Sequence, residues 1–386
     1  MVWSGATMAP RVIPFNQATV AEGQLEYVRQ AFENDHLSGD GPFGRRAEKL
    51  LAEATGAHRA LLTTSCTHAL EMSALLLDLE PGDEVIVPAF TFVSTVNAFA
   101  LRGAVPVFCD VRADTLNLDE ALLADKITAR TKAIVPVHYA GVGCEMDAIL
   151  ALANPRGIAV VEDNAHGLFG SYKGKPLGSF GALATQSFHE TKNFSCGEGG
   201  ALLVNDERFA ERAEVLREKG TNRSRFFRGQ VDKYTWVDLG SSWVLSDVLG
   251  AILLAQLEAR RSIQERRARI WSRYAAGLAD WARAREVRLP IVPEHCEQAF
   301  HMFYLLMPDL ERRTAFLSHL ARAGIKAVFH YQPLHLSPKG LELGAARAGD
   351  CPVTERAGDC LVRLPFYADL GEADQDRVIE AVTAFV

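Results

Sequence analysis

Seven short segments in the first 204 residues are rich in aliphatic and β-branched side chains and have the length of β-strands. Helical patterns fill most of the gaps between the early ones, and turn signals such as Pro81-Gly82-Asp83 separate the elements. Strands that alternate with helices form a mainly parallel sheet with crossover helices. The pattern therefore predicts an α/β fold with a mainly parallel seven-stranded sheet. The predicted strands are residues 59–63, 84–88, 105–110, 132–137, 158–163, 183–188 and 200–204.

A second, smaller unit is expected because 386 residues are too many for one simple core. A long helix is predicted from Ser246, with a basic face that we expect to be solvated, and strands are predicted at 302–307 and 327–331. We predict a large domain at residues 1–254, which includes the N-terminal segment 1–25, and a smaller α+β domain at residues 255–386. The basic face consists of Arg260, Arg261, Arg266 and Arg267.

The composition is that of an ordinary globular protein, with 48% hydrophobic and 23% charged residues. The net charge of -7 argues against a nucleic-acid-binding surface. No apolar run approaches the roughly 20 residues that span a bilayer, and residues 1–10 lack the basic and apolar regions of a secretion signal. Seven cysteines without a Cys-x-x-Cys pair indicate reduced thiols and no metal site. We therefore expect a cytoplasmic protein without a membrane or nucleic-acid partner.

Asp163 and Lys192 carry the strongest chemical signal. Asp163 closes an apolar strand, and Lys192 lies about thirty positions later on a hydroxyl-rich loop that precedes a glycine run. A lysine amine can form a Schiff base with pyridoxal 5'-phosphate (PLP), and a carboxylate can keep the pyridine nitrogen protonated. Taken singly, such an aspartate is more often a strand-end cap or an ion-pair partner, and such a lysine is usually a solvated surface charge. Their combination predicts a PLP site.

Two further segments fit the same cofactor. Ser65, Cys66 and Thr67 stand between a predicted strand and a helix, and the amino end of a helix binds anions such as phosphate. Ser187 lies five positions before Lys192, within reach of a phosphate on the same loop. Phe92 follows another strand, where an aromatic ring can stack on a flat heterocycle. The ordinary alternatives are a helix cap and a core phenylalanine.

Nearly the whole chain resembles the DegT/DnrJ/StrS family of nucleotide-sugar aminotransferases, which are fold type I PLP enzymes. The resemblance is greatest to the WecE (RffA) branch, whose members are dTDP-4-amino-4,6-dideoxygalactose transaminases. It implies that residues 1–10 precede the family's usual start near Ile13. The segments that carry it are Val137 to Gly141, Ser187 to Asn193, Glu218 to Asp232 and His330 to His335.

The resemblance assigns roles to individual residues. Lys192 matches the Schiff-base lysine, and Asp163 matches the partner of the pyridine nitrogen. His166 matches a position near the ring hydroxyl, and Phe92 matches the stacking aromatic. The matches to the phosphate cradle are Ser65, Cys66, Thr67 and Ser187.

The family also implies a homodimer whose active sites are shared between subunits. In many members an asparagine reaches the cofactor phosphate of the neighbouring subunit, and Ser242 stands at that position here. The arginine that follows it in those members is Val244 in this chain, so no charged contact is carried over. Part of the loop 220–235 is expected to approach the second site.

A cluster of cations and aromatic residues is the predicted binding site for the substrate diphosphate. Arg223, Arg225, Arg228 and Lys233 alternate with Phe226, Phe227, Tyr234 and Trp236, which could hold two phosphates and a stacked base. A solvated loop is the alternative. His330, Tyr331 and His335 are predicted to contact sugar hydroxyls, or to be structural.

The reaction that the resemblance implies is amino transfer from L-glutamate to the 4-keto carbon of dTDP-4-keto-6-deoxy-D-glucose. The products would be dTDP-4-amino-4,6-dideoxy-D-galactose and 2-oxoglutarate. The alternatives are a 3-amino product, a 4-amino product of gluco configuration, and other fold type I chemistry such as aldol cleavage or desulfuration. A PLP-binding regulatory protein without turnover is an alternative of a different class.

Overall fold

The computed structural model describes residues 11–386, and the predicted extension at residues 1–10 lies outside them. Its centre is a seven-stranded sheet in the order β1-β9-β8-β5-β4-β2-β3. The strands from β8 to β3 are parallel, whereas β9 runs antiparallel to both of its neighbours. The strands are β1 Arg59–Thr63, β2 Glu84–Pro88, β3 Val105–Cys109, β4 Thr131–Ile134, β5 Ala159–Asp163, β8 Leu183–Ser187 and β9 Gly200–Val204.

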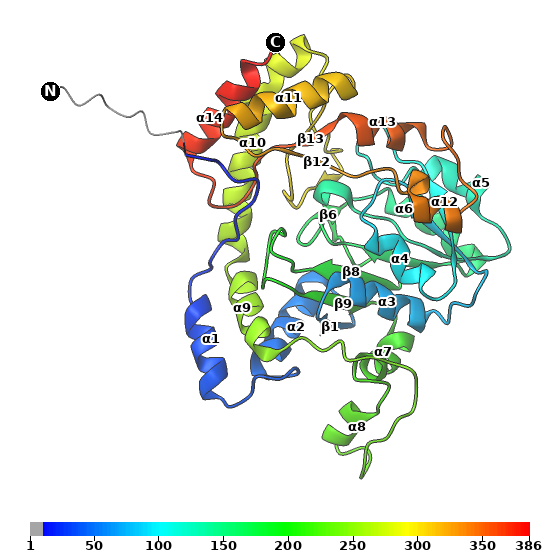
Figure 1. The fold of residues 1–386 in the computed structure, drawn as a ribbon. Helices are drawn as coiled ribbons and strands as arrows, with labels where there is room; N and C mark the ends of the chain where they lie inside the picture. The colour runs from blue at the N-terminus through cyan, green and yellow to red at the C-terminus, as the bar shows by residue number, and fades with distance from the viewer. Residues whose placement is uncertain (1–10) are drawn as a thin grey trace.

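All seven predicted strands are present, and so the predicted fold class is confirmed. Their side chains are almost all buried because helices cover both faces of the sheet (Figure 1). The helices of this part are α1 Gln24–Glu33, α2 Pro42–Thr55, α3 Cys66–Leu76, α4 Ser94–Ala100, α5 Leu123–Lys126, α6 Met146–Ala153, α7 Ala210–Arg217, α8 Arg223–Phe227 and α9 Asp247–Glu258. A small separate sheet contains β6 Ser171–Tyr172, which pairs on one side with β7 Lys175–Pro176 and on the other with β10 Cys296–Glu297.

The C-terminal part contains a three-stranded antiparallel sheet in the order β11-β13-β12. Strands β11 Tyr304–Leu306 and β12 Val328–Phe329 are shorter than the predicted segments, and β13 Leu361–Arg363 was not predicted. A strand of three residues is too short to show an alternating pattern. The helices here are α10 Arg260–Ala284, α11 Leu310–Arg322, α12 Pro338–Leu343, α13 Pro352–Cys360 and α14 Glu372–Thr383.

The long helix predicted from Ser246 is two consecutive helices, α9 and α10, with Ala259 between them. The Ser246 hydroxyl accepts a hydrogen bond from Leu249 N and caps α9. The N-terminal segment reaches the C-terminal part, since Ile13 pairs with Ile325 and packs into its core. The domain limits at residues 254 and 255 stay a prediction. No helix among residues 11–386 is both long and apolar enough to cross a membrane.

Candidate active site

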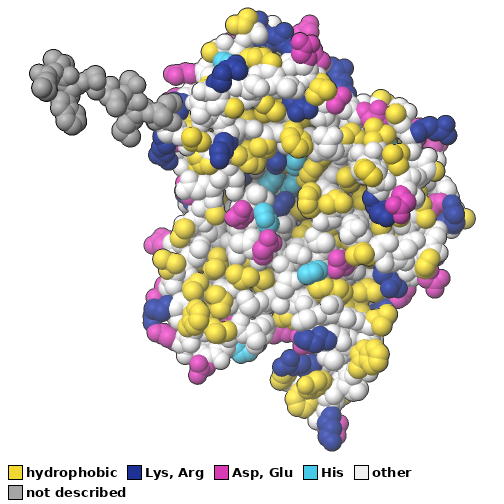
Figure 2. All heavy atoms as spheres, in the orientation of Figure 1, with side chains coloured by type: hydrophobic (Ala, Val, Ile, Leu, Met, Phe, Trp, Pro, Cys, Tyr) yellow, Lys and Arg dark blue, Asp and Glu magenta, His cyan; other side chains and the backbone are white. Residues whose placement is uncertain are grey.

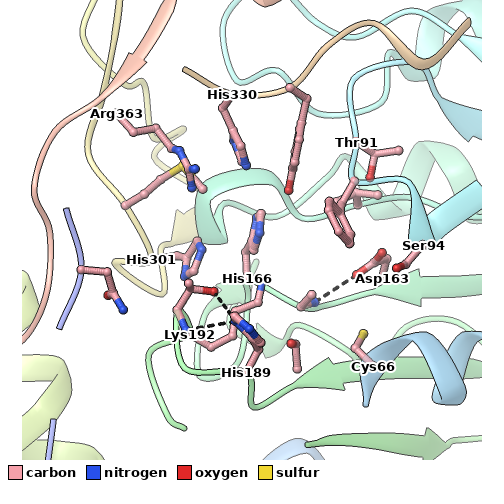
Figure 3. Close-up of a pocket in the computed structure, with 18 of the residues that line it drawn as sticks. Cys66, Thr91, Ser94, Asp163, His166, His189, Lys192, His301, His330 and Arg363 are labelled. Carbon is pink, nitrogen blue, oxygen red and sulfur yellow. Dashed lines mark hydrogen bonds between the residues drawn. The ribbon is translucent and has the colours of Figure 1, made fainter. Parts of the chain in front are cut away.

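A cavity of about 700 Å³ lies at the carboxyl ends of β5 and β8, between the large sheet and the C-terminal sheet. Ligand sites of open α/β sheets form at this edge. Histidine and basic side chains are visible in the hollow at the middle of the face shown in Figure 2. Arg363, His330, His301 and His166 approach the cavity from one side, and Asp163, Ser94 and Cys66 line the other (Figure 3).

Asp163 is fixed at the end of β5 by hydrogen bonds to both carboxylate oxygens. Thr95 Oγ1 donates to Oδ2 at 2.7 Å, and Ala165 N donates to Oδ1 at 3.2 Å. Thr95 Oγ1 in turn lies 2.8 Å from Thr91 Oγ1. The carboxylate is only 5% exposed, yet it still lines the cavity. The structure therefore presents a rigid negative charge to whatever fills this space.

Lys192, the residue predicted to form the Schiff base, also lines the cavity. Burial lowers the pKa of its amine to about 8, although the neighbouring Cys66 and Asp163 favour the charged form. An uncharged amine is the form that attacks an aldehyde. At neutral pH this lysine is therefore a much better nucleophile than an exposed one.

The reactivity of Lys192 in the cofactor-free protein should titrate with a midpoint near pH 8, because burial lowers its pKa to about that value. Trace acetylation followed by mass spectrometry of the Lys192 peptide measures this, with a free lysine peptide (pKa about 10.4) as the reference. The variant Asp163→Asn removes a charge that favours the ammonium form, and so its midpoint should be lower still. A midpoint near that of the free peptide would contradict the assignment.

The predicted phosphate cradle is assembled at the start of α3. The Ser65 hydroxyl caps the helix by accepting a hydrogen bond from His68 N at 3.1 Å, and Thr67 Oγ1 lies 2.8 Å from Ser94 Oγ. A Cβ at Gly200 would lie 2.3 Å from Cys66 N, so only glycine lets β9 pass this close to the helix. Burial raises the pKa of the Cys66 thiol to about 12, so it stays uncharged beside a phosphate. Ser187 lines the same cavity.

The remaining predicted cofactor and sugar contacts divide into two groups. Phe92, His166, His330 and Tyr331 line the cavity. Burial lowers the pKa of His166 well below its usual value, and its Nδ1 is buried without a hydrogen-bond partner among the described residues. His330 Nδ1 lies 2.9 Å from the Tyr139 hydroxyl. His166 is thus an uncharged ring with a free nitrogen, which suits a contact with a ring hydroxyl.

The other predicted site residues lie outside this cavity. His335 is fully buried, and its Nε2 lies 3.0 Å from Glu355 Oε1, so this histidine has a structural role in the described residues. Ser242 is exposed. Arg223, Arg225 and Arg228 form ion pairs with Glu218, Glu211 and Glu214 of their own chain, and Lys233 is exposed. Any role for these residues in a partner subunit's site stays a prediction.

The structure adds Arg363, which the sequence did not single out. It belongs to β13, and its guanidinium lies 4.7 Å from the centre of the Phe15 ring. No carboxylate within residues 11–386 pairs with Arg363, and its Nε is buried without a partner. Burial lowers its pKa. A buried arginine without a carboxylate partner can bind an anion.

The residues present fit PLP. The Asp163 carboxylate could hold a protonated pyridine nitrogen, and the Lys192 amine lines the same cavity. The start of α3, with its small polar side chains, could hold the phosphate. Phe92 is 57% exposed in the cavity wall, so its ring is available for stacking.

Comparisons with known proteins agree with this geometry. The spore coat polysaccharide biosynthesis protein SpsC of Bacillus subtilis is 33% identical over 382 residues, which cover 97% of each chain. Aminotransferase TlmJ from Streptoalloteichus hindustanus is 33% identical, with a TM-score of 0.87 over 96% of this chain and 98% of that one. The putative sugar aminotransferase Spr1654 from Streptococcus pneumoniae, in its PLP form, is 28% identical, with a TM-score of 0.89 over 97% and 98% of the two chains.

Residues 18–383 match the DegT/DnrJ/EryC1/StrS aminotransferase family, which confirms the predicted family. The predicted cofactor agrees with both the site and the PLP form of the relative. The fold, the site and the match over most of the chain lead to one conclusion: the protein belongs to the DegT/DnrJ/EryC1/StrS aminotransferase family.

Proposed function

We propose that the protein is a PLP-dependent nucleotide-sugar aminotransferase. It would move the amino group of L-glutamate to C4 of dTDP-4-keto-6-deoxy-D-glucose, giving dTDP-4-amino-4,6-dideoxy-D-galactose and 2-oxoglutarate. The observation that carries the reaction class is the pair of Lys192 and Asp163 in one cavity, with the pKa of the lysine lowered to about 8. The choice of sugar rests on the resemblance to the WecE branch in the segments 218–232 and 330–335.

Each residue has a distinct task in this proposal. Bound PLP supplies an electron sink that makes the α-hydrogen of the amino donor acidic. Asp163 holds the proton on the pyridine nitrogen. Lys192 Nζ removes the proton from the donor α-carbon, and later delivers a proton at C4 of the sugar. His166 orients the ring hydroxyl.

The amino donor has a candidate anchor in Arg363. Glutamate carries two carboxylates, and Arg363 is a cation in the cavity that pairs with no carboxylate of residues 11–386. Arginine binds carboxylate with two parallel hydrogen bonds. We therefore assign Arg363 to the donor, whereas the cations near α8 are assigned to the sugar nucleotide.

These assignments predict opposite effects in the two half-reactions. Arg363→Met should raise the apparent KM for glutamate by about tenfold or more, since a hydrogen bond to a charged group is worth about 1.5–3 kcal/mol. Arg228→Ala should raise the apparent KM for the sugar and leave the glutamate half-reaction unchanged. Single-turnover absorbance of the bound cofactor follows each half-reaction separately. If either variant lost both half-reactions equally, fold damage would be the explanation.

A homodimer with shared sites is part of the proposal. Residues 218–240, which we call the projecting segment, include α8 and extend away from the body, opposite the C-terminal helices (Figure 1). Phe227 and Trp236 are 69% and 72% exposed there, which a second copy could cover. Ser242 is the second residue after this segment. A monomer that remained fully active at micromolar concentration would contradict this part.

The substrate can be tested with a panel of nucleotide-linked keto sugars. After incubation with glutamate, only an accepted keto sugar should return the cofactor absorbance to its starting form. We expect the fastest return with dTDP-4-keto-6-deoxy-D-glucose and a slower one with its UDP counterpart. No spectral change with glutamate would favour a PLP-binding regulatory protein, and a change without return by any keto sugar would favour other fold type I chemistry.

The seven free cysteines agree with a cytoplasmic location, which we also propose.

A further inference from the structure

His301 lines the cavity, and the residue that follows Lys192 fixes the protonation of its ring. Asn193 Nδ2 donates to Ala299 O at 2.6 Å, which leaves Oδ1 as the amide atom that faces His301. Asn193 Oδ1 lies 2.9 Å from His301 Nδ1. Because an amide oxygen only accepts hydrogen bonds, His301 Nδ1 must carry the hydrogen. The ring is therefore held in the Nδ1–H form, and its Nε2 has a free lone pair.

The backbone on which His301 sits is also held. Arg267 donates from Nε to Phe300 O at 2.8 Å and from Nη2 to His301 O at 2.6 Å. Phe300 has φ of 51°, a left-handed conformation that costs energy for a phenylalanine. The prediction that Arg267 lies on a solvated face was wrong, because it is 3% exposed and its guanidinium satisfies these carbonyls. The position of His301 is thus fixed at both backbone and side chain.

His301 Nε2 faces the cavity without a partner. The ring lines the cavity, and none of the hydrogen bonds among residues 11–386 involves Nε2. The His301 ring stacks on the His166 ring, with 4.1 Å between the centroids and 13° between the planes. Because one face of the ring is covered in this way, polar contacts are made at the ring edge, where the nitrogen atoms lie. Burial, together with the nearby His166 and Lys192, lowers the pKa of His301 well below its usual value. Nε2 is therefore an uncharged hydrogen-bond acceptor.

We propose that His301 Nε2 accepts a hydrogen bond from a hydroxyl group of the keto sugar and so contributes to specificity for the acceptor substrate. The inference rests on the proposed function, in which the acceptor is a sugar. An uncharged lone pair attracts an O–H donor and repels a carboxylate, so His301 disfavours contact with the carboxylates of glutamate. Arg363, on the same side of the cavity, has the opposite preference, because its positive charge attracts a carboxylate (Figure 3). The two residues would then distinguish the two substrates that use one cavity.

Two substitutions separate the nitrogen atoms of the ring. His301→Asn places an amide N–H near the position of Nδ1 and removes Nε2, and His301→Gln places an amide oxygen near the position of Nε2. With the best keto sugar of the panel, His301→Asn should raise the apparent KM about five- to tenfold, the effect of one uncharged hydrogen bond. The glutamate half-reaction should stay within twofold of the parent. His301→Gln should recover part of the loss. His295→Asn is the control, because His295 is exposed and lies outside the cavity.

A second measurement needs neither turnover nor a variant that folds well. Nitrogen-15 NMR of histidines in the cofactor-free protein should show His301 as a neutral ring with hydrogen on Nδ1, the less common form of free imidazole. An Nε2–H form or a charged ring would overturn the inference. It would also be overturned if His301→Asn slowed both half-reactions equally. If no keto sugar is aminated, both the proposed function and the inferred sugar contact are wrong. The NMR result would still decide separately whether Nε2 is a hydrogen-bond acceptor.

Discussion

Lys192→Ala should lose turnover by several orders of magnitude and still fold. Loss of a positioned proton-transfer group alone costs roughly 10²–10⁴-fold, and the covalent link to the cofactor disappears as well. Its side chain lies in a cavity and forms no ion pair among residues 11–386, so little stability should be lost. Rates of both half-reactions, together with thermal unfolding of the cofactor-free protein, measure this.

Borohydride reduction gives the sharper readout for the same variant. In the parent, reduction should attach PLP permanently to the peptide that contains Lys192, as seen by mass spectrometry. The variant should bind PLP without becoming labelled. Lys132→Ala, an exposed lysine of β4, is the matched control and should behave like the parent. Labelling of another lysine in Lys192→Ala, with turnover retained, would show that the assignment is wrong.

Asp163→Ala should also lower turnover severely, by about 10²–10³-fold, the usual cost of removing one oriented group that stabilises charge in an active site. Without the carboxylate, the pyridine nitrogen loses its proton and the electron sink weakens. The rate of the glutamate half-reaction should carry most of the loss, because that step removes the α-proton.

Asp163→Asn separates this role from that of a strand-end cap. The amide oxygen can still accept the hydrogen bond from Ala165 N while the amide nitrogen donates to Thr95 Oγ1, so a cap would be largely retained. We expect Asp163→Asn to keep the unfolding temperature of the parent and to lose turnover nearly as severely as Asp163→Ala. Lost stability with turnover within a few-fold of the parent would identify Asp163 as a structural cap.

The parts of the site that the sequence predicted are those with a local signal. Asp163 is the end of an apolar strand, and Ser65 to Thr67 stand at a strand-to-helix turn, so each can be placed by its neighbours in the chain. Lys192 lies on a loop flanked by glycines and hydroxyl residues. The central sheet was predictable for the same reason, because each of its strands is a short segment whose side chains are mostly buried and apolar.

The parts that were missed depend on contacts between distant segments. His301 gains its properties from Asn193, 108 positions earlier, and Arg363 stands out only because the fold brings no carboxylate of residues 11–386 to it. Arg267 belongs to a basic run, so nothing local indicates that it is buried against two carbonyl groups. Sequence patterns indicate which faces are apolar, but the partners of polar side chains are determined by tertiary packing.

The structure of the product tests the central claim most directly. The enzyme should be incubated with L-glutamate and dTDP-4-keto-6-deoxy-D-glucose, and the purified nucleotide sugar solved by proton and carbon NMR. The account predicts nitrogen at C4, in the axial orientation of the galacto configuration, with one 2-oxoglutarate formed for each amine. An amine at C3, or an equatorial C4 amine of gluco configuration, would contradict it.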